Sequence, residues 1–280
     1  MPRPRSIAPA ELYEYPAHLR DTVSAMPGGP GVYLLFGAAG APLYIGKSVN
    51  LRARLLSHLR TPEEARLLRQ TRSIEVRPTA GEVGALLLES RLIKELQPLY
   101  NKRLRKSRRL SSIALCEEGI DIVDTTAAAA TRPLYGLFRS RRAATESLCE
   151  LADEHGLCLA LLGLERPSGR ACFRHQIGKC RGACVGHESP GEHRQRLSEA
   201  LANWKVEHWP HPAAIALYER HDELEAFHVI NQWHYLGSFP SLAAAREAPS
   251  RPPASFDADS YRILVRPIMA PTVPIIELGS

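Results

Sequence analysis

The stretch of sequence that decides the fold reads GVYLLFGAAGAPLYIG over residues 31–46. Two β-prone runs flank a break bounded by glycines, and this pattern predicts an antiparallel hairpin. With the turn centred between Ala38 and Ala39, Tyr33 lies directly opposite Tyr44, and both side chains project from one face of the sheet. A slip of one residue in the register would separate them.

Helical patterns and a third strand follow the hairpin. Leucines at positions 51, 55, 56 and 59 recur at helical spacing, which leaves Arg54 and His58 together on another face of the same helix. A capping box that begins at Thr61 predicts a second short helix. Alternation of polar and apolar residues over 73–77 then predicts a third strand.

A long helix is predicted over 82–96, and it carries a carboxylate among apolar residues. Glu89 has apolar neighbours one turn before it and one turn after it. A buried carboxylate costs several kcal/mol unless it is paired or bound to a metal. The alternative is that the apolar stripe is wide and that Glu89 lies at its rim.

A dense basic run follows the helical region. Residues 102–109 read KRLRKSRR, six cations in eight residues, and we interpret 103–111 as a linker that ends the first domain. A charge run of one sign suits contact with a phosphate backbone, while a solvated surface segment is the alternative. The predicted DNA-contacting residues are Arg103, Arg105, Lys106, Arg108 and Arg109.

The rest of the chain is predicted to form a second domain over 112–205 and a C-terminal extension over 206–280. The second domain shows two strand patterns, an apolar helix from Thr145 to about Leu162, a cysteine-rich loop and a further helix. In the extension, three strand-like runs stand out: 214–218, 227–230 and 261–265.

Four of the six cysteines are candidate metal ligands: Cys158, Cys172, Cys180 and Cys184. They are separated by 13, 7 and 3 residues, which is not the paired spacing of a zinc ribbon. Four thiolates suit an iron–sulfur cluster or zinc alike. Free thiols are the remaining alternative, since unligated cysteine behaves as a small buried hydrophobe.

Composition limits the class of protein. The 280 residues carry a formal net charge of +6, with 44% hydrophobic and 24% charged residues, which is typical of a soluble globular protein. No apolar run approaches the roughly 20 residues of a membrane span, and no signal-peptide core follows the start. We therefore expect a cytoplasmic protein without a membrane partner. The calculated pI of about 9.1 favours a polyanionic partner.

The hairpin motif, GVY followed by YIGK, resembles the signature of GIY-YIG nucleases. Further matches are an arginine on the next helix, LLLE at 86–89, LIK at 92–94 and PLYN at 98–101. Together they resemble the nuclease domain of the UvrC family, and the cysteine region resembles the segment that follows it there. The resemblance implies an α/β (α+β) fold over 25–102, a small three-stranded antiparallel sheet flanked by helices. A cysteine-rich domain and a C-terminal α+β extension follow. The match is to short members of the family, because UvrC's second nuclease half has no counterpart here.

The same resemblance implies metal-dependent phosphodiester hydrolysis. Glu89 would bind one Mg²⁺ or Mn²⁺, and Tyr44 would be the general base, with its pKa lowered by neighbouring cations. His58 stands where UvrC proteins commonly carry tyrosine, and we expect it either to relay a proton or to be a helix-surface histidine. The predicted catalytic residues are Tyr33, Tyr44, Lys47, Arg54, His58, Glu89 and Asn101.

The resemblance also implies the substrate, the partners and the second cofactor. It points to a DNA endonuclease of nucleotide excision repair that makes the 3′-side incision in damaged double-stranded DNA, with UvrB as partner and UvrA acting upstream. It favours a [4Fe–4S] cluster on the four cysteines, with zinc as the alternative. Two other functions stay open: another structure-specific GIY-YIG nuclease, and a catalytically silent scaffold that binds DNA or UvrB.

Overall fold

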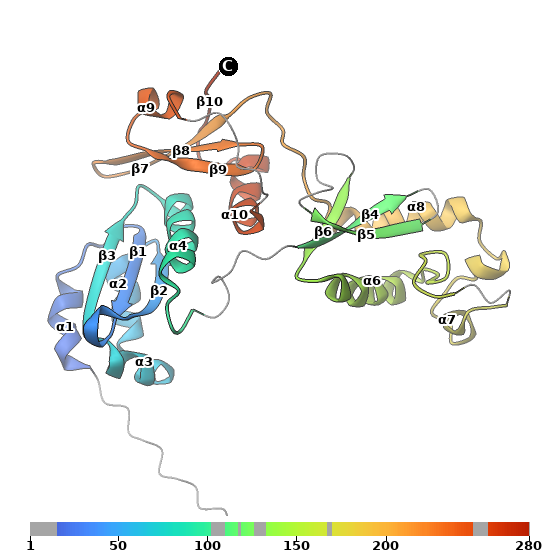
Figure 1. Ribbon diagram of the computed structural model, residues 1–280, viewed down its shortest axis with the longest axis horizontal. Coiled ribbons are helices and arrows are strands. Elements are labelled where there is room, and N and C mark those ends of the chain that lie inside the picture. The colour runs from blue at the N-terminus through green and yellow to red at the C-terminus, as the bar shows by residue number, and fades with distance from the viewer. Residues whose placement is uncertain are drawn as a thin grey trace, which may run out of the picture. The chain divides into compact units, whose positions relative to one another are not determined.

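The computed structural model describes residues 16–101, 110–116, 119–125, 133–166, 170–248 and 257–279. The chain forms two compact units (Figure 1). The first unites residues 1–106 with 211–252 and 259–280, so that the N-terminal region and the C-terminal segment form one unit. The second comprises 107–210 and 253–258. The predicted DNA-contacting run, Arg103, Arg105, Lys106, Arg108 and Arg109, lies outside the described residues.

The N-terminal region, residues 17–101, is a three-stranded antiparallel sheet with helices on both faces. Its strands pair in the order β2-β1-β3, so β2 is an edge strand. The elements are α1 (Ala17–Ser24), β1 (Gly31–Phe36), β2 (Pro42–Ser48), α2 (Leu51–His58), α3 (Ala65–Gln70), β3 (Ser73–Pro78) and α4 (Glu82–Leu96).

Alternation along strand β1 divides the core into two layers. Val32 and Leu34 pack with Leu92 and Ile93 of helix α4. Tyr33 and Leu35 point to the opposite face, into a cluster with the leucines of α1 and α2. Because successive side chains of a strand alternate between faces, this one strand supports helices on both sides of the sheet.

The register of the hairpin differs from the predicted one. Tyr33 pairs with Gly46, while Tyr44 pairs with Leu35, so the two tyrosines are diagonal neighbours and do not lie opposite each other. The turn is centred later than predicted because Ala39 and the following glycine both have positive φ, at 54° and 72°. The shift amounts to two residues, which keeps both phenols on one face.

The predicted capping box at Thr61 is wrong. The Thr61 hydroxyl donates to the backbone oxygen of Ser57, and the carboxylate of Glu64 is paired with His58 instead. A short 3-10 turn over Pro62–Glu64 precedes α3. The carboxylate that was predicted to cap the start of a helix therefore contacts helix α2 instead.

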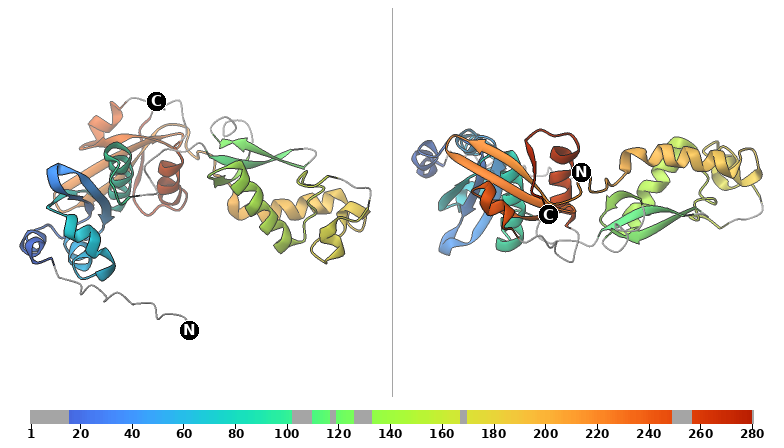
Figure 2. Two further views of the ribbon diagram at one scale, coloured as in Figure 1. Left: turned by 60° about the horizontal axis from the view of Figure 1, so that its bottom comes forward. Right: turned by 90° about the horizontal axis from the view of Figure 1, so that it is seen from above.

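The C-terminal segment of the first unit is a four-stranded antiparallel sheet in the order β10-β7-β8-β9 with two helices. The predicted strand over 261–265 is wrong, because these residues lie in helix α10 (Figure 2). Tyr261, Leu264 and Ile268 are buried at helical spacing. The elements are β7 (Ile215–His221), β8 (Leu224–Asn231), β9 (His234–Phe239), α9 (Leu242–Arg246), α10 (Ala258–Met269) and β10 (Ile275–Glu277).

The second unit packs a three-stranded sheet, in the order β5-β4-β6, against helices α6 and α8. Helix α6 ends earlier than the predicted Leu162, because Gly156 adopts a left-handed conformation with φ of 65°. The apolar residues that follow helix α6 lie in a turn and pack into the core of this unit. The elements are β4 (Ser111–Cys116), β5 (Gly119–Asp124), β6 (Leu134–Phe138), α6 (Arg141–His155), α7 (Phe173–Gln176) and α8 (Pro190–Leu201).

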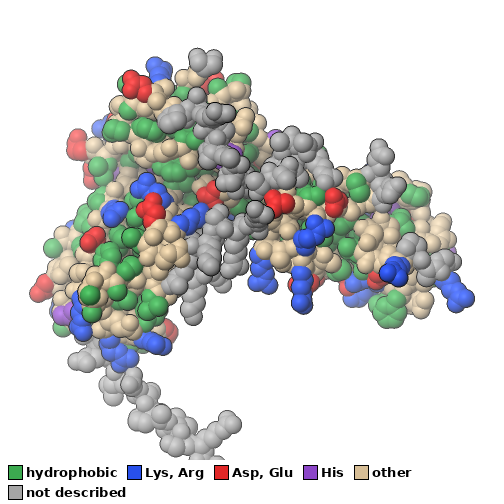
Figure 3. Space-filling view, in the orientation of Figure 1, with side chains coloured by type: hydrophobic (Ala, Val, Ile, Leu, Met, Phe, Trp, Pro, Cys, Tyr) green, Lys and Arg blue, Asp and Glu red, His purple; other side chains and the backbone are tan. Residues whose placement is uncertain are grey.

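Among the described residues, the helices are too short or too polar to cross a membrane. On the face drawn in Figure 3, basic and acidic side chains are interspersed over the N-terminal region.

Candidate active site and metal centre

Three rings gather where strands β1 and β2 meet helix α2. The ring centroids of Tyr33 and Tyr44 are 6.1 Å apart, and His58 lies 5.2 Å from the first and 6.1 Å from the second. The sequence brings them together through one hairpin and one helical turn. The predicted proximity of the two phenols is therefore present, although the register that produces it is different.

A buried hydrogen-bond chain runs through His58. Its Nε2 lies 2.6 Å from the hydroxyl of Tyr33, and its Nδ1 is paired with a carboxylate oxygen of Glu64. Because a carboxylate can only accept, Nδ1 carries the proton and Nε2 accepts from the tyrosine. His58 is 3% exposed. This excludes the alternative of a helix-surface histidine.

The glycines of the motif make room for close contacts. A Cβ on Gly46 would lie 2.3 Å from the hydroxyl oxygen of Tyr33, and one on Gly31 would lie 2.5 Å from the backbone oxygen of Arg77. Real Cβ atoms essentially never approach other atoms so closely. The glycine in YIG therefore leaves the space in which the tyrosine of GVY is held.

The two phenols are held in their neutral form by their surroundings. Burial and the neighbouring Tyr44 raise the pKa of Tyr33. Burial raises the pKa of Tyr44 as well, and the negative charge of Glu89 adds to that effect. Arg54 opposes both shifts, but the prediction that neighbouring cations lower the pKa of Tyr44 is wrong, because burial and Glu89 outweigh Arg54 and the ammonium of Lys47 is paired with Glu82. A positive charge near Glu89 would therefore lower the pKa of Tyr44.

Glu89 projects from helix α4 toward the edge strand. Its Oε1 accepts a hydrogen bond of 3.1 Å from the backbone N–H of Lys47, which leaves Oε2 for a cation. The side chain is half-buried, so it lies at the rim of the apolar stripe. Burial raises the pKa of the Glu89 carboxyl, and the backbone N–H of Lys47 partly offsets this. A hard divalent cation fits a partly desolvated carboxylate of this kind.

Asn101 ties the end of the nuclease region to strand β2. Its Oδ1 accepts from the backbone N–H of Ile45 at 2.9 Å, and its Nδ2 donates to the backbone oxygen of the same residue at 2.8 Å. Leu99 and Tyr100 donate backbone hydrogen bonds to Pro42 and Leu43. The side chain of Asn101 thus positions the strand that carries Tyr44.

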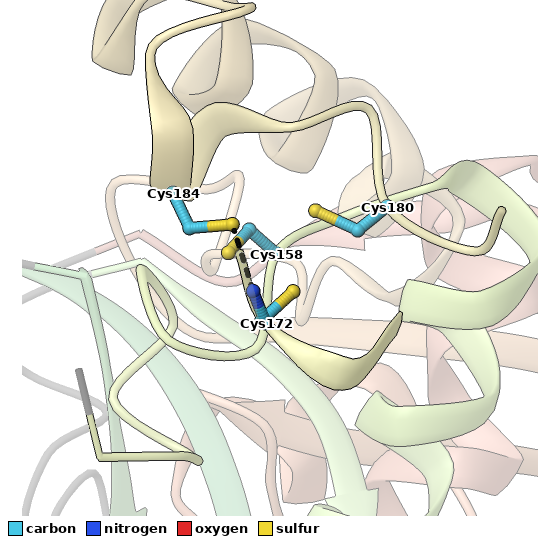
Figure 4. Close-up of side chains that lie close together, drawn as sticks. All are labelled: Cys158, Cys172, Cys180 and Cys184. Atoms are coloured by element: carbon cyan, nitrogen blue, oxygen red, sulfur yellow. Dashed lines mark hydrogen bonds between the residues drawn. The ribbon is translucent and has the colours of Figure 1, made fainter. Parts of the chain in front are cut away.

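The four predicted cysteine ligands lie together in the second unit (Figure 4). Their sulfur atoms are all within 4.8 Å of one another, although the residues span positions 158–184 of the chain. Cys158, Cys172 and Cys180 are buried, and Cys184 is partly exposed. Four convergent thiols are a donor set that binds a soft metal centre.

The protein environment orients these thiols. His193 on α8 is 3% exposed, and its Nε2 accepts a 2.9 Å hydrogen bond from the backbone N–H of Cys158. Burial raises the pKa of the Cys172 thiol to about 12. The pKa of Cys184 is lowered, because hydrogen bonds from Cys172 and the other thiols outweigh burial. Cys184 is therefore easier to ionise than Cys172, and a bound metal would supply the positive charge that favours all four thiolates.

Sequence reasoning missed three residues around the site. Glu64 was interpreted as part of a capping box, although it pairs with His58. Glu219 and His228, from the C-terminal segment, contact the start of helix α4. The sequence signal for Glu219 and His228 was indirect. Glycines stand at 81 and 84, at the start of a helix, and glycine there allows another segment to approach the helix closely.

This sheet, with its tyrosine pair and its carboxylate on α4, defines an endonuclease of the GIY-YIG class. Family comparisons match the UvrC-like GIY-YIG domain over residues 29–102, the UvrC/Cho excinuclease middle domain over 111–203, and the excinuclease Cho C-terminal domain over 214–280. Relatives named excinuclease Cho are 50% and 52% identical to this chain over 96% of its length, and so the chain belongs to the excinuclease Cho family.

Two relatives support this assignment over nearly the whole chain. Excinuclease Cho of Salmonella typhi is 52% identical, over 96% of this chain and 93% of its own. Excinuclease Cho of Escherichia coli K12 is 50% identical, over 96% and 92%. The crystal structure of the N-terminal endonuclease domain of UvrC from Thermotoga maritima, bound to magnesium, is 34% identical. The match covers 30% of this chain and 97% of the UvrC domain, with a TM-score of 0.28.

Proposed function

We propose that this endonuclease makes the 3′-side incision at damaged double-stranded DNA after UvrA and UvrB have marked the lesion, in the cytoplasm. The observation that carries the proposal is the placement of Glu89 beside the edge strand that bears Tyr44. A carboxylate for a cation and a phenol for a proton lie at one edge of one sheet. Hydrolysis of a phosphodiester needs charge neutralisation on the phosphate and an acceptor for the proton of the attacking water, and these two groups can supply both.

A Mg²⁺ or Mn²⁺ ion held by Glu89 would neutralise charge on the phosphate and stabilise the leaving oxygen. Tyr44 then takes the proton of the attacking water. Its phenolate is stabilised by the hydroxyl of Tyr33 and by the guanidinium of Arg54. Arg54, which is exposed on α2, also meets the phosphate as negative charge develops on it.

The chain through His58 gives the proton a path away from the phosphate. Tyr33 donates to Nε2 of His58, and Nδ1 of the same ring is held by Glu64. Before the attack, Tyr44 can pass its proton to Tyr33 as Tyr33 passes its own to Nε2 of His58, so that Tyr44 becomes the phenolate, Tyr33 stays neutral and the imidazole carries the added proton. Glu64 stabilises the imidazolium that results. We therefore assign His58 as the relay and Glu64 as its positioning residue.

For DNA binding we propose the basic run from Arg103 to Arg109. Its cations would each contact a backbone phosphate and release counterions, which gives affinity without sequence preference. Lesion specificity would then come from UvrB. This division leaves the nuclease region free of any need to read bases.

We propose that the four cysteines hold a metal centre in the second unit, a [4Fe–4S] cluster in the first place. Around a single tetrahedral zinc with Zn–S of about 2.3 Å, sulfur atoms would be about 3.8 Å apart. In a four-iron cluster each sulfur binds a different iron, so the sulfurs must spread further. The spacing within 4.8 Å is nearer to that around zinc, and a four-iron cluster would require the cysteines to move apart, so zinc is the alternative. Metal analysis of anaerobically purified protein separates them: about four irons, one zinc or neither.

Incision of a duplex with one defined lesion tests the function. The assay contains Mg²⁺, with and without UvrA and UvrB, and labels each strand end separately; Glu89→Gln is the inactive control. A single cut on the 3′ side that requires UvrB supports the proposal. Cutting of branched or undamaged DNA without UvrB would assign another GIY-YIG activity, and DNA binding with no cutting would indicate a silent scaffold.

A further inference from the structure

Helix α4 begins without a cap of its own. Its N-cap residue is Gly81, which has no side chain to satisfy the first N–H groups. The missing acceptor comes from strand β7, more than 130 residues further along the chain. Glu219 accepts from the backbone N–H of Val83 through Oε1 and from that of Gly84 through Oε2, both at 2.8 Å. A carboxylate at this position also meets the positive end of the helix dipole.

Glu219 is itself held in place. Its side chain is 4% exposed, and Oε2 lies 3.0 Å from Nε2 of His228 on strand β8, which is 3% exposed. Burial alone would raise the pKa of Glu219, but the hydrogen bonds from His228 and from the two amides lower it. The carboxylate is therefore charged, and a buried charge is tolerated only where its partners are fixed.

The start of α4 is shaped to receive this pair. A Cβ on Gly81 would lie 2.3 Å from the carboxyl carbon of Glu219, and one on Gly84 would lie 2.9 Å from the ring of His228. Glycine weakens a helix interior relative to alanine. Its presence at position 84 is explained by the close approach of the imidazole.

The opposite end of α4 is also bound to the C-terminal segment. Nζ of Lys94, in the last turn of the helix, lies 3.1 Å from Oδ2 of Asp259 at the start of α10. Both ends of the helix are thus attached to one partner. Glu89 lies between them, about 9 Å along the axis from Val83 at a rise of about 1.5 Å per residue.

We infer that Glu219 and His228 are positioning residues for the nuclease reaction: by fixing the start of helix α4, they set where Glu89 stands against strand β2. The inference rests on the proposed cation-binding role of Glu89. Under this inference the C-terminal domain contributes to catalysis by positioning helix α4. A displacement of about 1 Å at a reacting group is enough to cost about 100-fold in rate.

The test uses the full-length protein with three variants: Glu219→Ala, Glu219→Gln and Gly84→Ala. The matched control is Val229→Ala, which removes buried volume from the same domain one residue from His228 but on the opposite face of β8. For each protein we would measure Mg²⁺-dependent nicking, the half-saturating Mg²⁺ concentration, KM for DNA and hydrogen exchange over residues 82–86.

We expect Glu219→Ala to lower kcat at least about ten-fold, to raise the half-saturating Mg²⁺ several-fold and to leave KM for DNA unchanged. Glu219→Gln keeps one acceptor oxygen and should show a smaller effect. Gly84→Ala should show the same signature as Glu219→Ala although it favours helix, because the methyl displaces His228. Faster exchange over 82–86 should accompany these losses and be absent from Val229→Ala.

The inference is overturned if Glu219→Ala and Gly84→Ala only lower Tm as the control does, with kcat and the Mg²⁺ dependence unchanged. If Glu219→Ala does not fold, the other two variants decide in the same way. If the wild-type protein does not cleave with Mg²⁺ at all, the proposed function fails. Hydrogen exchange then still tests whether Glu219 fixes the start of helix α4. Unchanged exchange over 82–86 in the variants would refute that contact, and faster exchange would support it.

Discussion

Substitution of Gly46 by alanine tests whether the second motif glycine exists to accommodate Tyr33. The added methyl would lie 2.3 Å from the hydroxyl oxygen and 2.5 Å from Cζ of that tyrosine. Tyr33 is 1% exposed and hydrogen-bonded to His58, so its ring has no free space to enter. The backbone at position 46 is not left-handed, and therefore the whole effect of the substitution is steric.

The size of the effect follows from two contributions. Overpacking in a filled core costs about 1–3 kcal/mol. Displacement of the phenol also breaks the hydrogen bond to His58, worth about 0.5–1.5 kcal/mol. The free energy of unfolding should therefore fall by about 1.5–4.5 kcal/mol, and kcat for nicking should fall because the ring that supports Tyr44 has moved.

Urea denaturation of the first unit and Mg²⁺-dependent nicking measure the two effects. Gly28→Ala is the matched control in the same region, since a Cβ there meets only the Asn50 amide at an ordinary 3.9 Å. We expect the control to change stability by less than about 1 kcal/mol. If Gly46→Ala is as stable and as active as the control, the explanation of the motif glycine is wrong.

Three further predictions concern the metal site, the cysteine centre and pH. Glu89→Gln should keep DNA binding and abolish nicking, because the amide has the shape but not the charge that holds the cation; nicking within a few-fold of wild type would remove the metal-ligand role. Cys180→Ala should lose bound metal and UvrB-dependent incision but keep weak Mn²⁺-driven nicking; loss of both in folded protein would couple the centre to catalysis. The folded-state pKa of Glu219 is lowered from 4.5, so the stability difference between wild type and Glu219→Gln should be present above pH 4.5 and decline as pH falls through the lower folded value. A difference that does not change with acidification would show that the carboxylate charge is not what stabilises the helix start.

The local elements of the nuclease region could be predicted from sequence because their signals are local. The strand over 73–77 and the helix over 82–96 each follow from periodicity within one segment, and the structure places them within a residue of the prediction. The register of the hairpin could not be predicted, since it depends on Ala39 adopting a positive φ that alanine rarely adopts.

Helix α10 shows a second reason for error. Residues 261–265 read YRILV, a composition of β-branched and aromatic residues that favours a strand. In the fold, the apolar side chains at 261, 264 and 268 are buried while Arg262 and Arg266 are exposed. Packing of one helical face therefore overrode the intrinsic preference of the segment.

The site itself was predictable only in part. The motif residues Tyr33, Tyr44 and Glu89 come together as the resemblance implied, and so do the four cysteine sulfurs. Glu219 could not be predicted, because its partner Val83 is 136 residues away and no local pattern connects them. Contacts of this kind depend on how separately formed sheets meet.

The segment 99–101 has a consequence for solubility. Strand β2 is an edge strand, and an edge offers unpaired N–H and C=O groups to any other chain in an extended conformation. Backbone hydrogen bonds from Leu99 and Tyr100, and both amide atoms of Asn101, occupy that edge along Pro42, Leu43 and Ile45. The strand that carries the proposed general base is thereby protected from β-pairing between molecules. Asn101 would therefore reduce aggregation in addition to holding strand β2 in position.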